Sequence, residues 1–94
     1  MVFCLYIFNV NATIVKGFVA DSLSQKPLAF ASLFIKGTSF STISQQDGSF
    51  EFSLPPGNYI IVCKYVNYLT KETPITVTNN SPLITINLTS ITFS

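Results

Sequence analysis

The sequence predicts an all-β fold of about seven short strands, either a sandwich or a barrel. Runs of β-branched and aromatic residues recur at regular spacing, and Pro, Gly, Asn or Asp bounds each run. Several runs alternate apolar and polar residues with a period of two, which is typical of half-buried strands. No helical period is long enough to predict a helix. Two sheets packed about 10 Å apart would share the aliphatic and aromatic side chains between them.

The first expected strand is Thr13–Ala20, which places Val15, Gly17 and Val19 on one face. A polar connection leads to the second, Leu28–Lys36, which a Gly-Thr dipeptide ends. The residues expected on one face of this second strand are Ala31, Leu33 and Ile35, and those on the other are Phe30, Ser32 and Phe34.

A third, short strand is expected at Ser41–Ser44. The Asp47-Gly48 dipeptide then predicts a tight turn, because glycine accepts a positive φ at no steric cost. The turn leads into a half-buried strand with period two. Its alternating apolar residues are Phe50, Phe52 and Leu54.

The last three strands follow a rigid Pro-Pro-Gly turn that ends at Gly57. Tyr59–Val66 is the most hydrophobic run and is therefore the expected central strand. Leu69–Thr78 contains Pro74, which cannot donate a ladder hydrogen bond, so this run is predicted to be an edge strand or to be bulged there. Leu83–Thr89 closes the domain.

Composition narrows the function classes. The chain has 94 residues, which suffice for one domain. Of these residues 48% are hydrophobic and 10% are charged, and this composition argues against disorder. A net charge of +1 gives no electrostatic footprint for nucleic acid or for an acidic membrane surface. Histidine, the commonest general base and a frequent metal ligand, is absent. We therefore expect neither a metal site nor a cofactor.

The two cysteines do not form a disulfide framework. Cys4 lies in a segment that we expect to be removed, which leaves Cys63 alone. The alternation of Cys63 with Tyr59, Ile61 and Tyr65 predicts a buried thiol that behaves as a small hydrophobe.

Residues 1–12 resemble the end of a secretory signal. An apolar run, Val2–Phe8, precedes Val10 and Ala12, which are small residues at the minus-three and minus-one positions of a cleavage site. The run is too short to span a bilayer, which needs about 20 apolar residues. The basic region that opens such signals is absent, and an extra edge strand is the alternative. Residues 91–94 are expected to begin a linker or to be a truncated end.

Five stretches, taken in order, resemble the carboxypeptidase-regulatory-like domains. They are VKGFVAD at Val15–Asp21, KPLAFASLFIKGT at Lys26–Thr38, QDGSF at Gln46–Phe50, PGNY at Pro56–Tyr59 and YVNY at Tyr65–Tyr68. Each stretch is weak alone, but their order and spacing match the family pattern across essentially all of the domain that we expect at 13–90.

The resemblance implies a transthyretin-like Greek-key sandwich that serves as a non-catalytic appendage. In bacteria of the Bacteroidetes type, such domains commonly follow a signal peptide and precede the plug and barrel of TonB-dependent receptors or other outer-membrane proteins. It also implies structural turn and anchor roles for Gly17, Asp47, Gly48, Gly57, Tyr59 and Tyr68.

Two positions depart from the family pattern. Asn67 stands where the family has a glycine, and asparagine tolerates a left-handed φ better than other non-glycine residues. Ser44-Gln45 replaces the usual Thr-Asp before the turn, so any cation held by that aspartate is lost.

The acidic side chains have ordinary structural explanations. Asp21 and Asp47 lie at expected turns, where they would cap the backbone, and Glu51 and Glu72 fall on polar strand faces. The sequence contains no catalytic triad, metalloprotease, phosphate-loop or redox dithiol motif.

Phenylalanines are the candidates for a binding face. Phe18, Phe30 and Phe34 either fill the sandwich or join Phe40 in an exposed patch suited to protein contact or sugar stacking.

The sequence leaves three candidate functions. The first is an accessory module in the periplasm or outer membrane that contacts other domains of its parent chain or envelope partners. The second is a carbohydrate-binding sandwich, against which the absence of Trp counts. The third is a transthyretin-like hydrolase, against which the absence of His counts.

Overall fold

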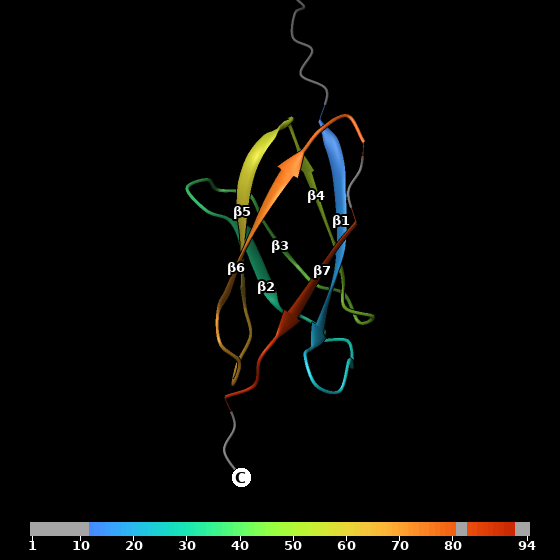
Figure 1. Cartoon of the computed structure of the whole chain (residues 1–94), viewed down its shortest axis with the longest axis vertical. Coiled ribbons are helices and arrows are strands. Elements are labelled where there is room, and N and C mark those ends of the chain that lie inside the picture. Colours follow the sequence, from blue (N-terminus) through green and yellow to red (C-terminus); the bar gives the residue numbers. More distant parts are fainter. Residues whose placement is uncertain (1–11, 81–82, 92–94) are drawn as a thin grey trace, which may run out of the picture.

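Two β-sheets pack face to face in the computed structural model, which describes residues 12–80 and 83–91 (Figure 1). The signal-like residues 1–11 and the end at 92–94 lie outside the described residues. The strands are β1 (Thr13–Asp21), β2 (Ser32–Ile35), β3 (Ser41–Ile43), β4 (Ser49–Leu54), β5 (Gly57–Lys64), β6 (Lys71–Val77) and β7 (Leu83–Leu88). The all-β, seven-stranded sandwich is thus confirmed.

The strand order is β4-β1-β7 in one sheet and β3-β2-β5-β6 in the other. All neighbouring strands are antiparallel except β1 and β7, which run parallel in a register that pairs Lys16 with Leu83 and Asp21 with Leu88. The chain crosses between the sheets after β1, β3, β4 and β6, as Greek-key connections do.

The core forms because each long strand turns one alternate set of side chains inward. In β1 the inward set is Val15, Gly17 and Val19, which the sequence placed together on one face. The other buried apolar side chains are Leu28, Ala31, Leu33, Ile35, Phe50, Phe52, Leu54, Ile61, Val62, Cys63, Val77, Ile86 and Leu88. This set supplies the apolar area that stabilises a domain of this size.

The second strand is shorter than predicted. Leu28–Lys36 was expected to be extended throughout, but pairing begins only at Ser32. Phe30 has a φ of 65°, a left-handed conformation that a pleated strand cannot accommodate. The chain therefore bends before Ala31.

The edge position of the proline-containing strand is confirmed. β6 borders only β5, where Pro74 lies opposite Ile60 in the register. The strand keeps its pairing on both sides of the proline, because an edge strand needs ladder donors on one side only. β5, the expected central strand, lies between β2 and β6.

The sandwich has two ends (Figure 1). The end at which β1 and β7 finish is called the lower end, and it carries the loops 22–31, 44–48 and 65–70 and the segment 89–91. The upper end carries the loops 36–40 and 55–56 and the start of β1. The described chain therefore enters at one end and leaves at the other.

Candidate functional site

A tyrosine–aspartate pair joins two loops of the lower end. The Tyr68 hydroxyl donates a hydrogen bond to Asp21 Oδ2 at 2.5 Å. The other oxygen, Asp21 Oδ1, accepts the backbone N–H groups of Leu23 and Ser24, both at 2.8 Å. Tyr68 also packs against Tyr65, with ring centroids 5.5 Å apart. Asp21 thus caps its own turn, as expected, and in addition ties the β5–β6 loop to β1.

These hydrogen bonds favour the charged form of the carboxylate. The Tyr68 hydroxyl and then the Ser24 and Leu23 N–H groups lower the pKa of Asp21 from 3.8 to about 2. The same bond raises the pKa of the Tyr68 hydroxyl, because the phenol serves as donor only while it is protonated.

This pair makes stability depend on pH at the acid end. The unfolded chain takes up a proton on Asp21 near pH 3.8 and the folded chain only near pH 2, so the free energy of unfolding falls as pH drops through that window. We expect Tyr68→Phe to flatten this fall, because the pKa of Asp21 moves back toward its ordinary value. Urea unfolding midpoints at pH 5, pH 3 and pH 2.5 measure the effect.

Tyr65→Phe is the matched control, since it leaves the Tyr68 hydroxyl in place and should keep the acid slope. An acid slope in Tyr68→Phe as steep as in the unsubstituted chain would show that this bond does not couple stability to pH.

Ser44 is a buried residue whose role the sequence did not reveal. Its hydroxyl accepts the Ala31 N–H at 2.8 Å and donates to the Leu28 carbonyl at 2.7 Å, and the side chain is 1% exposed. The Phe30 N–H also bonds to the Ser44 carbonyl at 2.9 Å. Ser44 therefore supplies hydrogen-bond partners to the backbone of the bent segment before β2. The sequence signal was only that the family's usual threonine also carries a hydroxyl at this position.

The Asp47-Gly48 turn packs onto the end of β1. Asp47 Oδ1 accepts the Ser49 N–H at 3.0 Å and the Ser49 hydroxyl at 2.6 Å, which lowers the pKa of Asp47. Gly48 has a φ of 82°, and its carbonyl accepts the Val19 N–H at 2.8 Å. A Cβ at Gly48 would lie 2.6 Å from the Val19 carbonyl oxygen, so glycine is required there.

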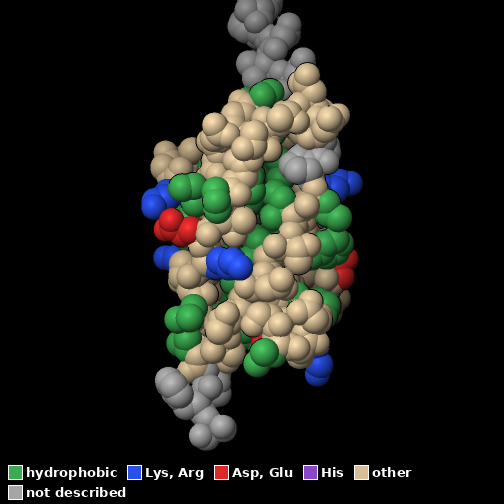
Figure 2. Space-filling view, in the orientation of Figure 1, with side chains coloured by type: hydrophobic (Ala, Val, Ile, Leu, Met, Phe, Trp, Pro, Cys, Tyr) green, Lys and Arg blue, Asp and Glu red, His purple; other side chains and the backbone are tan. Residues whose placement is uncertain are grey.

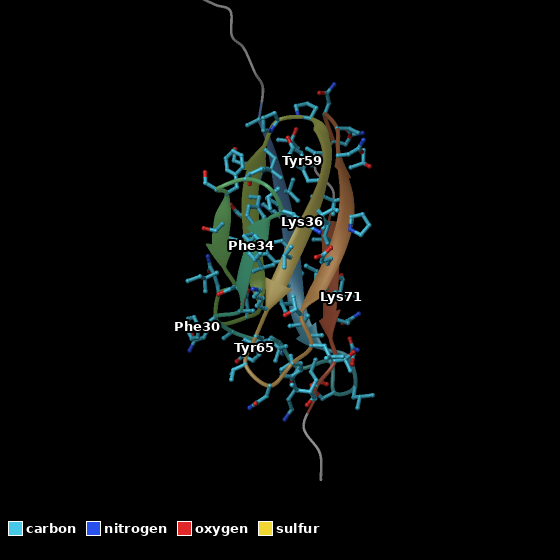
Figure 3. The ribbon with its side chains drawn as sticks, turned by 90° about the vertical axis from the view of Figure 1, so that its left-hand side faces the viewer. Phe30, Phe34, Lys36, Tyr59, Tyr65 and Lys71 are labelled. Carbon is cyan, nitrogen blue, oxygen red and sulfur yellow. The ribbon has the colours of Figure 1, made fainter. Side chains whose placement is uncertain are left out.

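The remaining turn and anchor residues lie at three separate places. Gly17 lies in β1 beneath the Phe50 ring. Gly57 opens β5 beside the Tyr59 ring, and the Tyr59 hydroxyl donates to the Pro55 carbonyl at 2.7 Å near the upper end (Figure 3). Asn67 adopts a φ of 67°, which confirms that it can stand in for the family's glycine. These residues do not converge on one site.

The four candidate phenylalanines lie on different surfaces. Phe18 is 42% exposed on the outer face of β1, and Phe40 lies in the β2–β3 loop at the upper end. Phe34 is half-buried on the outer face of β2 beneath the Lys64 ammonium, 5.6 Å from the ring centroid, and Phe30 is 68% exposed at the lower end (Figure 3). The interpretation that Phe18 and Phe30 fill the sandwich is wrong, because alternation and the bend at Phe30 turn both rings outward. The four rings do not form a single platform.

A shallow depression of about 490 Å³ lies on the outer face of β5 and β6. Its lining includes the side chains or backbone of Lys36, Ile60, Pro74 and Thr76. At the side of this face, Lys36 Nζ pairs with Glu72 Oε1 at 3.3 Å, and both side chains are about half exposed. An exposed pair of this kind contributes little stability.

Cys63 is fully buried in β5, as its alternation predicted. Burial raises the pKa of its thiol to about 11, which suppresses the reactive thiolate. We expect a thiol reagent at pH 8 to modify Cys63 only as fast as the domain unfolds. Peptide mapping by mass spectrometry keeps any reaction at Cys4 separate. Fast labelling of Cys63 in the folded chain would contradict the burial.

The described residues contain no group of three His, Cys, Asp or Glu side chains that could hold a metal ion. Within the same residues, no helix is long and apolar enough to cross a membrane. Charged side chains are scattered over the visible face in Figure 2.

Together, the layers and bonded turns define a small β-sandwich domain of the regulatory-like class. The chain belongs to the CarboxypepD_reg-like domain family, whose model matches residues 15–93. It is also 36% identical over 66 residues to the TonB-dependent receptor SusC of Bacteroides thetaiotaomicron, a match that covers 70% of this chain and 6% of SusC. The chain thus spans only a small part of the length of this relative.

Solved structures share the fold. A chain of a type II cohesin–X-dockerin complex from Acetivibrio cellulolyticus gives a TM-score of 0.67 at 24% identity, covering 81% of this chain and 56% of that one. The major pilin subunit BcpA of Bacillus cereus gives a TM-score of 0.70 at 16% sequence identity, and the match covers 85% of this chain and 30% of that one. A DUF3823 family protein from Bacteroides ovatus gives a TM-score of 0.62 at 22% sequence identity, and the match covers 84% of this chain and 45% of that one. At these identities the likeness concerns the fold alone.

Proposed function

We propose that this chain is a non-catalytic accessory domain of a larger exported bacterial protein, a TonB-dependent receptor or a related envelope protein, and that it contacts other domains of that protein or its envelope partners. The observation that carries the proposal is the 36% identity to SusC over 70% of the chain, within a family match that spans residues 15–93. The proposed location is the periplasm or the outer membrane.

The geometry of the ends supports an in-line module. β1 begins at the upper end and β7 finishes at the lower end, because these two strands run parallel side by side (Figure 1). A preceding segment and a following segment can therefore attach at opposite ends without crossing either sheet.

The state of the reactive groups supports a non-catalytic role. Asp21 accepts hydrogen bonds from N–H groups of its own turn and from the Tyr68 hydroxyl of the β5–β6 loop, and Asp47 accepts them from Ser49. Both carboxylates are thereby held in the charged form. Cys63 is buried with its thiol protonated. A general base or nucleophile needs access to substrate and a matched pKa, and these three groups lack one or both. The dispersed phenylalanines give no stacking platform, so we do not extend the proposal to glycan binding.

A pair of chromosomal substitutions tests the proposal in the natural protein. Gly17→Val should unfold this domain within its parent, whereas Gly37→Ala adds a methyl group where no atom lies within 4 Å. We expect the Gly17→Val parent to reach the envelope but to lose proteins that co-purify with the unsubstituted parent and with Gly37→Ala. An unchanged set of co-purified proteins together with unchanged protease sensitivity of the neighbouring domains, or substrate turnover by the purified chain, would overturn the proposal.

A further inference from the structure

The lower end exposes five large apolar side chains. We define the lower-end patch as Leu23, Phe30, Val66, Leu69 and Ile91, whose exposed fractions are 91, 68, 75, 55 and 43%. They come from the β1–β2 loop, the β5–β6 loop and the segment after β7, which meet at this end (Figure 1). Exposed apolar residues gathered in this way mark contact surfaces more often than isolated ones do.

The backbone is strained at the same end. The described residues other than glycine that have a positive φ are Gln25, Phe30 and Asn67, at 63°, 65° and 67°, and all three lie in lower-end loops. Phe30 is the most informative, because a bulky residue rarely adopts this conformation. The strain holds its ring out in solvent, where it adds nothing to the core.

The loops that carry the patch are held firmly. The Phe30 N–H bonds to the Ser44 carbonyl at 2.9 Å, and the Ile91 N–H bonds to the Asn67 carbonyl at 2.9 Å. The Leu69 N–H bonds to the Thr89 carbonyl at 2.9 Å. The segment that leaves the sandwich is therefore fixed against the β5–β6 loop, so the patch is an ordered surface.

A depression of about 340 Å³ lies within this surface, lined by Phe30, Ser32, Lys64, Tyr65 and Val66. Phe30 and Tyr65 both lie toward the lower end in Figure 3. Lys64 is the charged residue of this lining. The depression suits an apolar side chain with a neighbouring carboxylate.

We propose that the lower-end patch docks onto the polypeptide that continues from Ile91 in the parent protein, through an apolar segment that carries acidic side chains; this inference rests on the proposed function. The position of Ile91 favours this occupant, because Ile91 is the last described residue, belongs to the patch and bonds through its N–H to the Asn67 carbonyl of the β5–β6 loop. A tethered segment binds at high effective concentration, so a small patch suffices. The matched part of SusC is 6% of that protein, so a relative with abundant further polypeptide exists.

Photo-crosslinking in the natural polypeptide tests the docking. A benzophenone amino acid replaces Val66 in the native host and, as the matched control, Phe40 at the upper end, which is also exposed. We expect Val66 to crosslink within its own polypeptide to residues beyond 94, as mapped by mass spectrometry, and Phe40 not to do so. Val66→Asp should also speed protease cleavage just after the domain several-fold, whereas Phe40→Asp should not.

Crosslinks from Val66 to a second copy or to another protein would overturn the inference, as would yields equal to those at Phe40. If the polypeptide is a large envelope protein and Val66 gives no internal crosslink, only the inference fails. If the polypeptide ends at Ser94, the proposed function fails with it.

Discussion

Gly17→Val is expected to destabilise the domain by about 3 kcal/mol or more, the largest effect of any single substitution considered for this chain. A Cβ at this position would lie 2.7 Å from Phe50 Cε2 and nearer still to the Ile84 carbonyl oxygen of β7. The oxygen belongs to a paired backbone and cannot move without breaking the β1–β7 register. Since a domain of this kind has a total stability of roughly 5–10 kcal/mol, we expect a large unfolded fraction. Urea titration followed by circular dichroism measures it.

Gly37→Ala is the control that separates the effect of steric overlap at Gly17 from the effect of replacing a glycine. Gly37 has a φ of 80° and open space around it, so alanine there costs only the roughly 1–2 kcal/mol of a left-handed backbone conformation. Gly17 has no positive φ, so its substitution reports overlap alone. Equal losses in the two variants would refute the close approach of β7 and Phe50 to Gly17.

Ser44→Ala is expected to cost about 2–4 kcal/mol, because it leaves the Ala31 N–H and the Leu28 carbonyl without their hydroxyl partner in a buried segment. Ser44→Thr should recover part of the loss, since it restores the hydroxyl. Ser41→Ala, at an exposed position on β3, is the matched control and should change stability by less than about 0.5 kcal/mol. A Ser44→Ala variant as stable as Ser41→Ala would show that the bent segment does not need this residue.

Alternation was the strongest guide to the fold. Ser49–Leu54 carries a strict period of two, and it became a strand with the expected face buried. Thr13–Ala20 also became a strand, and Val15, Gly17 and Val19 share one face as expected. The proline at 74 correctly indicated an edge strand. The second strand, expected at Leu28–Lys36, was predicted to be too long. No residue near Phe30 carries the usual signal of a left-handed φ, and the alternation of the sequence continues through the bend.

The candidate binding face was harder to predict. Alternation gives the side of a strand to which a ring points, but it does not say which side faces the other sheet. Phe18 alternates with Gly17 and Val19, and only packing decides that the smaller residues turn inward. The lower-end patch assembles loops that are more than 60 residues apart in the chain, such as those of Leu23 and Ile91, and sequence periodicity carries no signal for such proximity.

The Tyr68–Asp21 hydrogen bond also shows that the sequence predicts local contacts better than long-range ones. Each residue matched the family pattern separately, and Asp21 was expected to cap its own turn. Their contact spans 47 positions and follows from the β1–β7 pairing and the Leu69–Thr89 bond, which place both loops at one end. Local chemistry was therefore readable from the sequence, and long-range chemistry required the fold.

The most direct test of the central claim is the size and location of the natural polypeptide that carries this sequence. An antibody against residues 13–90, used on membrane and soluble fractions of the native host, measures both together. We predict one polypeptide far larger than the 10.3 kDa of this chain, in the outer-membrane fraction. A free 10 kDa protein in the cytoplasmic fraction would contradict the assignment of this sandwich to an exported parent protein.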